Sequence, residues 1–140
     1  MSYFPKLDRL SSLITMITCG AMLAAIPNHA VANSRSDSNY QNSCWNTQVD
    51  GATLSARCRR INGGSKRTSI SIRGIENRNG NLTYLSNSTN DSNYQNSCWN
   101  TQVDGENLSA RCRRINGGSK RTSISIRGIE NRNGNLTYLR

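Results

Sequence analysis

Apolar and polar residues alternate in short stretches along the chain from about residue 37 onward. Side chains of a β-strand point alternately to two faces, so a period of two predicts strands with one apolar and one polar face. No stretch shows the sustained 3.6-residue period of an amphipathic helix. The sequence therefore predicts an all-β fold with short helical turns. In the first half the apolar positions are Leu54, Ala56, Cys58, Ile70, Ile72, Leu82 and Tyr84, and the turn signals are Asp50-Gly51, Asn62-Gly63-Gly64 and Asn79-Gly80.

The chain also repeats itself with a period of 54 residues, because 37–85 matches 91–139 at all but two of 49 positions. Two copies are too few for a solenoid, so the halves either fold separately or complete each other's core. We place repeat 1 at 33–85, a polar linker at 86–90 and repeat 2 at 91–140. The two differing pairs are Ala52/Glu106 and Thr53/Asn107.

Residues 1–32 are predicted to be a removable signal peptide. Lys6 and Arg9 precede an apolar stretch over 10–26, and small residues end the segment at Ala30-Val31-Ala32. A membrane helix is the competing interpretation, but serines and threonines interrupt the stretch and Pro27 ends it. We expect a secreted or periplasmic protein with no membrane span in the mature chain.

Four cysteines remain after residue 32, namely Cys44, Cys58, Cys98 and Cys112. An even number in an exported chain favours disulfides over metal or redox chemistry. Of the three possible pairings, the repeat favours Cys44–Cys58 and Cys98–Cys112, while pairing across repeats stays open. Each predicted bridge closes a loop worth about 3 kcal/mol on the chain-entropy model.

The residue inventory argues against catalysis. The single histidine, His29, lies in the predicted signal peptide, and disulfide formation would leave no free thiol. Glu76 and Glu130 fall one in each predicted lobe, so neither has a second carboxylate for glycoside cleavage. Zinc sites are built mainly from histidine and free cysteine, which the mature chain would lack. We expect no enzymatic activity, no metal and no cofactor.

Each repeat combines several short motifs in a fixed order. They are an aromatic residue (Tyr40) four positions before Cys44, a cysteine spacing of 14, the Asp-Gly turn, Leu54-Ser55-Ala56-x-Cys58, Asn62-Gly63-Gly64, Thr68-Ser69-Ile70 and Ile75-Glu76-Asn77-x-Asn79-Gly80-x-Leu82. All of them recur in the second copy. On these features the repeat resembles the cyanovirin-N homology family.

The resemblance implies two pseudo-symmetric lobes, each a three-stranded sheet plus a hairpin exchanged between repeats. The lobes would comprise approximately 37–73 with 128–140, and 74–127. It also implies a lectin that binds mannose-type glycans through two metal-free sites at opposite ends. The first implied site contains Asn39, Asn42, Ser43, Arg59, Ile61, Asn131, Arg132 and Asn133. The second contains Asn93, Asn96, Ser97, Arg113, Ile115, Glu76, Asn77, Arg78 and Asn79.

Two departures from the family pattern bear on the ligand. Asn79 and Asn133 stand where the family usually has Asp, and Arg59 and Arg113 where it often has Glu. Carboxylates accept strong charge-assisted hydrogen bonds from sugar hydroxyls. We expect weaker binding of plain mannose, or a shifted preference toward glycans that carry phosphate, sulfate or carboxylate.

The positive net charge suggests an alternative function. The formal net charge is +10 at pH 7, so the protein would be drawn toward polyanions. A basic module that binds acidic polysaccharide or nucleic acid could use Arg57, Arg59, Arg73 and Arg78, with Trp45 and Trp99 for stacking, although packing of each tryptophan against its disulfide is favoured. Compared with the best-known member of the family, the linker is several residues longer and lacks the hinge proline, so we expect a monomer rather than a swapped dimer.

Overall fold

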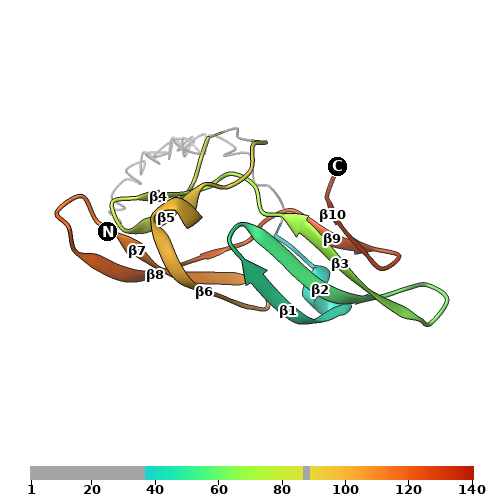
Figure 1. Cartoon of the computed structure of the whole chain (residues 1–140). Coiled ribbons are helices and arrows are strands. Elements are labelled where there is room, and N and C mark those ends of the chain that lie inside the picture. Colours follow the sequence, from blue (N-terminus) through green and yellow to red (C-terminus); the bar gives the residue numbers. More distant parts are fainter. Residues whose placement is uncertain (1–36, 87–88) are drawn as a thin grey trace, which may run out of the picture. The chain divides into compact units, whose positions relative to one another are not determined.

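The computed structural model describes residues 37–86 and 89–140, all of which belong to one compact unit. The predicted signal peptide and two residues of the linker lie outside the described residues. Every regular element in the described part is a β-strand or a single 3-10 turn. The prediction of an all-β fold with short helical turns is therefore confirmed (Figure 1).

Each repeat folds into one 3-10 turn followed by five strands. In the first repeat these are η1 (Tyr40–Asn42), β1 (Cys44–Asp50), β2 (Thr53–Arg59), β3 (Ser65–Ser71), β4 (Ile75–Arg78) and β5 (Asn81–Tyr84). In the second they are η2 (Tyr94–Asn96), β6 (Cys98–Asp104), β7 (Asn107–Arg113), β8 (Ser119–Ser125), β9 (Ile129–Arg132) and β10 (Asn135–Tyr138).

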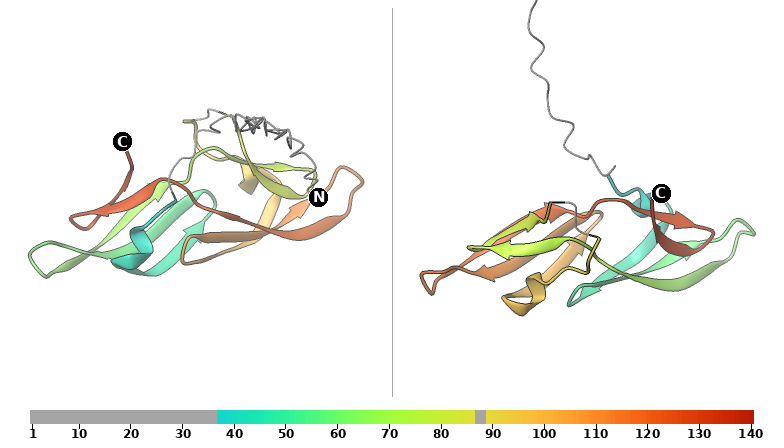
Figure 2. Two further views of the ribbon diagram at one scale, coloured as in Figure 1. Left: turned by 180° about the vertical axis from the view of Figure 1, so that it is seen from behind. Right: turned by 90° about the horizontal axis from the view of Figure 1, so that it is seen from above.

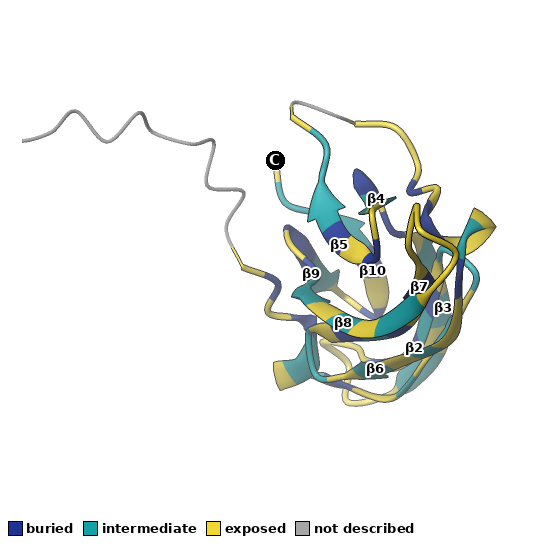
Figure 3. Ribbon diagram, turned by 90° about the vertical axis from the view of Figure 1, so that its left-hand side faces the viewer, coloured by how far each residue is buried: buried dark blue, intermediate teal, exposed yellow. Residues whose placement is uncertain are grey.

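The strands form two antiparallel three-stranded sheets, β1-β2-β3 and β6-β7-β8, and two hairpins, β4-β5 and β9-β10. Burial alternates along β2, where Leu54, Ala56 and Cys58 are buried between more exposed neighbours. Figure 3 shows buried and exposed positions along the other strands. A register shift between Trp45 and Gln48 marks a β-bulge in β1. Asn46 lies inside this bulge with a φ of 50°, a value that asparagine tolerates better than most residues.

The hairpins are exchanged between the repeats. The amide of Leu136 in β10 donates to Thr68 Oγ1 in β3 (3.2 Å), and the Tyr138 hydroxyl donates to the carbonyl of Ser71 (2.7 Å). Hairpin β4-β5 lies beside β8 in the same way (Figures 1 and 2). Each lobe thus combines the sheet of one repeat with the last hairpin of the other, as the family resemblance implied.

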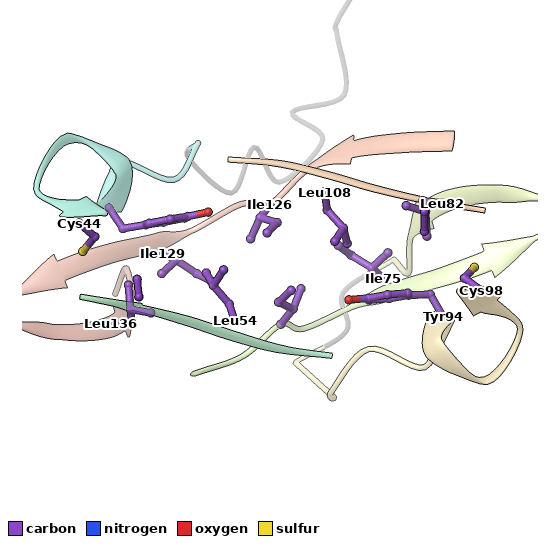
Figure 4. Packing of buried hydrophobic residues seen from close by; sticks show 14 of the residues in the cluster. Cys44, Leu54, Ile75, Leu82, Tyr94, Cys98, Leu108, Ile126, Ile129 and Leu136 are labelled. Carbon is purple, nitrogen blue, oxygen red and sulfur yellow. The ribbon is translucent and has the colours of Figure 1, made fainter. Parts of the chain in front are cut away.

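Each core is completed by this exchange. In Figure 4, Leu54 faces Ile129 and Leu136 in one lobe, while Leu108 lies with Ile75 and Leu82 in the other. Both hydrophobic groups are buried, and a small domain needs every such residue because its core is limited. The buried apolar residues are Tyr40, Cys44, Leu54, Ala56, Cys58, Ile72, Ile75, Leu82 and their counterparts Tyr94, Cys98, Leu108, Ala110, Cys112, Ile126, Ile129 and Leu136.

One disulfide joins the first two strands of each sheet. Cys44 and Cys58 are directly opposed in β1 and β2 and are bonded, and Cys98 and Cys112 are bonded between β6 and β7. The fold prediction of one disulfide per repeat is confirmed. The tryptophan that follows each first cysteine remains 41% exposed, however, although the sequence favoured packing against the bridge.

Candidate functional site

The tip of hairpin β9-β10 is fixed to the sheet of the first repeat by one asparagine. Arg132 pairs with Asn135, which leaves a two-residue turn, Asn133-Gly134, with φ values of 50° and 86°. Positive φ at both positions is the type I′ geometry that Asn-Gly favours. The Asn131 side-chain nitrogen donates to Ser43 Oγ and to the Arg59 carbonyl, both at 2.9 Å, and Asn131 Oδ1 accepts from the Gly134 amide at 2.8 Å.

A second contact holds the same tip against the segment after β2. Asn133 Oδ1 accepts from the backbone amide of Ile61 at 3.0 Å. Because the oxygen is engaged, the two N–H groups of the Asn133 side chain are left to donate to a ligand. The Ile61 side chain, 90% exposed beside this contact, supplies apolar surface.

The second lobe reproduces this arrangement. Asn77 donates to Ser97 Oγ and to the Arg113 carbonyl, both at 2.9 Å, and accepts from the Gly80 amide. Asn79 accepts from the Ile115 amide at 3.0 Å. The structure therefore gathers two sets of predicted site residues, one in each lobe, through hydrogen bonds of matching length.

The segments that precede β1 and β6 contribute exposed asparagine side chains to the candidate sites. The Asn39 amide donates to the Ile129 carbonyl (3.0 Å) and the Asn39 carbonyl accepts from Asn42 (3.1 Å), so both residues are positioned through their backbones. Their side chains are exposed, which leaves the amide groups free to donate and accept. Asn93 and Asn96 occupy the same positions in the second lobe.

The predicted site residues therefore divide into supporting and available groups. Asn131 and Asn77 use both amide N–H groups and their oxygen to bind the fold, so they position the tips. The side chains of Asn42 and Asn133, with Asn96 and Asn79, are exposed and can face a ligand. Arg59 and Arg113 contact the tips through their backbone carbonyls, but their side chains lie on the strand face of Arg57 and Arg111, opposite the buried Cys58 and Cys112. The exposed amide groups can donate to sugar hydroxyls.

Charged residues around the tips include groups that the predicted set omitted. Arg132 pairs with Glu130 at 2.6 Å, and Arg78 pairs with Glu76 at 2.7 Å. The predicted set included Glu76 but omitted Glu130. The near-identity of the repeats is the signal that could have identified Glu130.

Two more cations cover the turn glycine. A Cβ built on Gly134 would lie 2.7 Å from Arg60 Cγ and 3.3 Å from Lys66 Cγ, and Gly80 is covered by Arg114 and Lys120 in the same way. The turn therefore requires glycine both for its φ and for this close approach. Each tip consequently lies beside three cations, here Arg60, Lys66 and Arg132, and one carboxylate, so the site attracts anionic groups.

The part of the chain that the structure describes has no cluster of three or more His, Cys, Asp or Glu side chains suited to a metal ion. Within the same residues, no helix has the length and apolarity needed to cross a membrane. A groove of about 770 Å³ lies elsewhere, between β1 and β6. None of the predicted sugar-site residues lines it.

An all-β tandem repeat with exchanged hairpins and polar tips defines a protein of the two-lobed lectin class. The chain belongs to the CVNH (cyanovirin-N homology) domain family, whose model matches residues 40–137. The resemblance seen in the sequence is thereby confirmed, and the family is one of lectins rather than enzymes.

Solved structures of the family support the assignment. A variant of MoCVNH3 in complex with (N-GlcNAc)4 is 25% identical, with a TM-score of 0.60 over 72% of this chain and 97% of the other. The CVNH protein of T. borchii is 26% identical, with a TM-score of 0.59 over 71% and 98%. Microvirin, solved as a mannobiose complex, is 26% identical, with a TM-score of 0.55 over 71% and 97%.

Proposed function

We propose that the protein is an exported lectin that binds mannose-type glycans through two metal-free sites, one at each hairpin tip. The observation that carries the proposal is the double attachment of each tip. Asn131 ties the turn to Ser43 and Arg59, and Asn133 ties it to Ile61. A preformed arrangement of donors loses little entropy when it binds a ligand.

The family relatives support a carbohydrate as the ligand. Microvirin was solved with mannobiose and the MoCVNH3 variant with (N-GlcNAc)4. The present tips carry Asn133 and Asn79, with Arg60 and Arg114 beside the turn glycines, and these side chains provide donors rather than carboxylate acceptors. We therefore expect weaker binding of plain mannobiose than of mannose units that carry phosphate, sulfate or carboxylate.

The proposed location is secreted or periplasmic, and the proposed state is a monomer. Two disulfides favour an oxidising compartment. The hairpin exchange is satisfied within one chain, because β10 already packs against β3 and β5 against β8. A stable dimer in sedimentation at micromolar protein would contradict the monomer.

Calorimetric titration with mannobiose, in the presence and absence of EDTA, tests the proposal. The double variant Asn133→Gly/Asn79→Gly suits the positive φ of the turn but removes the exposed amide N–H groups together with the contacts to the Ile61 and Ile115 amides. We therefore expect affinity to fall about tenfold, a difference of about 1.4 kcal/mol. Asn135→Ala/Asn81→Ala is the matched control, because these asparagines lie on the same hairpins and each makes a single 3.4 Å contact. Equal losses in both variants, or loss of binding with EDTA, would refute the proposal.

A further inference from the structure

A second ligand surface follows from the register of the two sheets. Trp45 pairs with Arg57, and Arg57 pairs with Arg67, so the three side chains form one row across β1, β2 and β3. All three are exposed, and they lie on the face opposite the buried Leu54 and Ala56. We call this row the outer face of the first sheet. Trp99, Arg111 and Arg121 form the outer face of the second.

The paired arginines of the outer face repel each other without compensation. Like charges directly opposite in a sheet are unfavourable. Arg57 donates to Ser65 Oγ (3.3 Å) and Arg67 donates to Gln48 Oε1 (2.9 Å). The ion pairs found among the described residues are those of Arg78 and Arg132, so no carboxylate neutralises this row. Each guanidinium is held in place with several N–H donors unused.

An exposed aromatic ring adjoins these charges. Trp45 and Trp99 are each 41% exposed, although tryptophan is a large residue that is usually well buried. The negative face of the indole ring attracts the C–H groups of a sugar ring as well as cations. An aromatic platform beside fixed guanidinium groups suits a ligand that combines sugar rings with anionic groups.

The groove between β1 and β6 connects the two outer faces. Gln48 and Ser55 lie in the row next to Trp45 and Arg57 on the same face, and both line the groove. The groove holds about 770 Å³, and its lining from the other sheet includes Gln102 and Ser109. A chain molecule can therefore run from one arginine pair through the groove to the other.

The charge distribution along this path selects the ligand. Asp50 and Asp104 also line the groove. Their carboxylates repel a nucleic acid, which carries a phosphate at every nucleotide. The same carboxylates accept hydrogen bonds from neutral sugar hydroxyls. The path favours a ligand with hydroxyl-bearing sugars at its centre and anionic groups toward both ends.

We propose that the two outer faces and the groove between them bind an acidic polysaccharide, one that carries sulfate or carboxylate groups. Arg57, Arg67, Arg111 and Arg121 bind the anionic groups, and Trp45 and Trp99 stack on sugar rings. This surface is separate from the hairpin tips, because neither Asn133 nor Asn79 contributes to it.

Tryptophan emission gives a specific readout, because the chain has two tryptophans and both lie on the outer faces. The probe is a sparsely sulfated dextran sulfate, with sulfate on a minority of its sugars, so that unsulfated sugars can lie beside Asp50 and Asp104. We expect this dextran sulfate to change the emission and neutral dextran not to change it. The variant Arg57→Gln/Arg111→Gln should bind dextran sulfate about tenfold more weakly. The matched control Arg73→Gln/Arg127→Gln removes the same charge from two arginines that stack on Tyr138 and Tyr84 instead.

Each outcome decides the proposal. A large loss in Arg57→Gln/Arg111→Gln with less than about a twofold loss in the control supports it. Equal losses in both variants would show nonspecific charge attraction and overturn it. Single-stranded DNA that binds as tightly as dextran sulfate, with the same dependence on Arg57 and Arg111, would also overturn it. Asn133→Gly/Asn79→Gly should leave dextran sulfate binding unchanged; if it abolishes binding, the acidic ligand belongs to the tips.

Discussion

The two lobes contain nearly the same residues, yet they differ where each contacts the other. The Tyr40 hydroxyl donates to the Gly105 carbonyl and the Tyr94 hydroxyl donates to the Gly51 carbonyl, both at 2.6 Å. The residue after each glycine differs, since Glu106 follows one and Ala52 the other. Gln41 therefore reaches Glu106 at 3.3 Å, whereas its counterpart Gln95 is exposed and the position equivalent to Glu106 is Ala52, which offers no acceptor.

The difference between Ala52 and Glu106 does not extend to the hairpin tips. The hydrogen bonds of Asn131 and Asn133 match those of Asn77 and Asn79 within the lengths given above. The substitutions that separate the repeats thus fall at the junction of the lobes and spare both candidate sites. We conclude that the two sites should bind with affinities within a few fold, while the two lobes should differ slightly in stability.

Removal of a disulfide should have the largest effect and should be alike in both lobes. Cys44→Ser/Cys58→Ser opens a 15-residue loop and should lower the free energy of unfolding by about 3 kcal/mol. Cys98→Ser/Cys112→Ser should lower it by the same amount within about 0.5 kcal/mol. Guanidinium denaturation followed by circular dichroism measures both. A much larger loss in one variant would show that one lobe depends on the other for its stability.

Removal of the asparagine that supports one tip should abolish mannobiose binding at that tip and leave the other site intact. Asn131→Ala leaves the Gly134 amide and the Arg59 carbonyl without their partner and should destabilise the fold by about 2 kcal/mol. Mannobiose binding should fall from two sites to one, because the tip of the second lobe keeps Asn77. Calorimetry should give the same result for Asn77→Ala. Two remaining sites after either substitution would show that the support does not position the ligand groups.

High pH should weaken the contacts between the lobes. Burial raises the pKa of Tyr40 and of Tyr94 well above the usual value of 10.0, and the charge of Glu106 raises that of Tyr40 further. The unfolded chain therefore loses these protons first, so their stabilisation is complete below about pH 10 and is lost as the pH rises beyond it.

Denaturation midpoints at pH 8 and pH 11 measure this effect. Tyr40→Phe/Tyr94→Phe should be less stable at pH 8, by about 1 kcal/mol for each hydroxyl lost, but should lose less stability between the two pH values. A steeper pH dependence in the double variant than in the unaltered protein would contradict the assignment.

The smallest effect is expected where the repeats differ. Glu106→Ala makes the second turn like the first, removes the long Gln41 contact and should change stability by less than about 0.5 kcal/mol. It should also lower the pKa of Tyr40 and leave that of Tyr94 unchanged, which absorbance titration of the tyrosines can resolve. Mannobiose affinities should stay as they were in both lobes. A change at either tip would show that the junction and the sites are coupled.

The sequence predicted the sheets and hairpins because alternation and Asn-Gly turns are local signals. It did not predict that Asn131 and Asn77 support the tips, because their partners are contributed by the other repeat or by distant residues. Ser43 lies 88 residues from Asn131 in the chain. The sequence shows which residues carry side-chain amides, but not which of these amides are already hydrogen-bonded within the fold.

The outer faces depend on a feature that alternation cannot reveal. Trp45 and Gln48 are three residues apart, and in a regular strand they would point to opposite faces. The bulge at Asn46 inserts one residue, so Trp45 pairs with Arg57 and Gln48 with Ser55 on the same face. The sequence alone identified the arginines and tryptophans but could not place them in one row.

Chemical-shift mapping during titration with mannobiose is the most direct test that the exchanged hairpin tips form the ligand sites. We predict that the largest shifts occur at Asn133, Ile61 and Asn42 and at Asn79, Ile115 and Asn96, with both sets saturating at concentrations within a few fold of each other. Shifts confined to one set, or centred on the groove between β1 and β6 with the tips unchanged, would contradict the account.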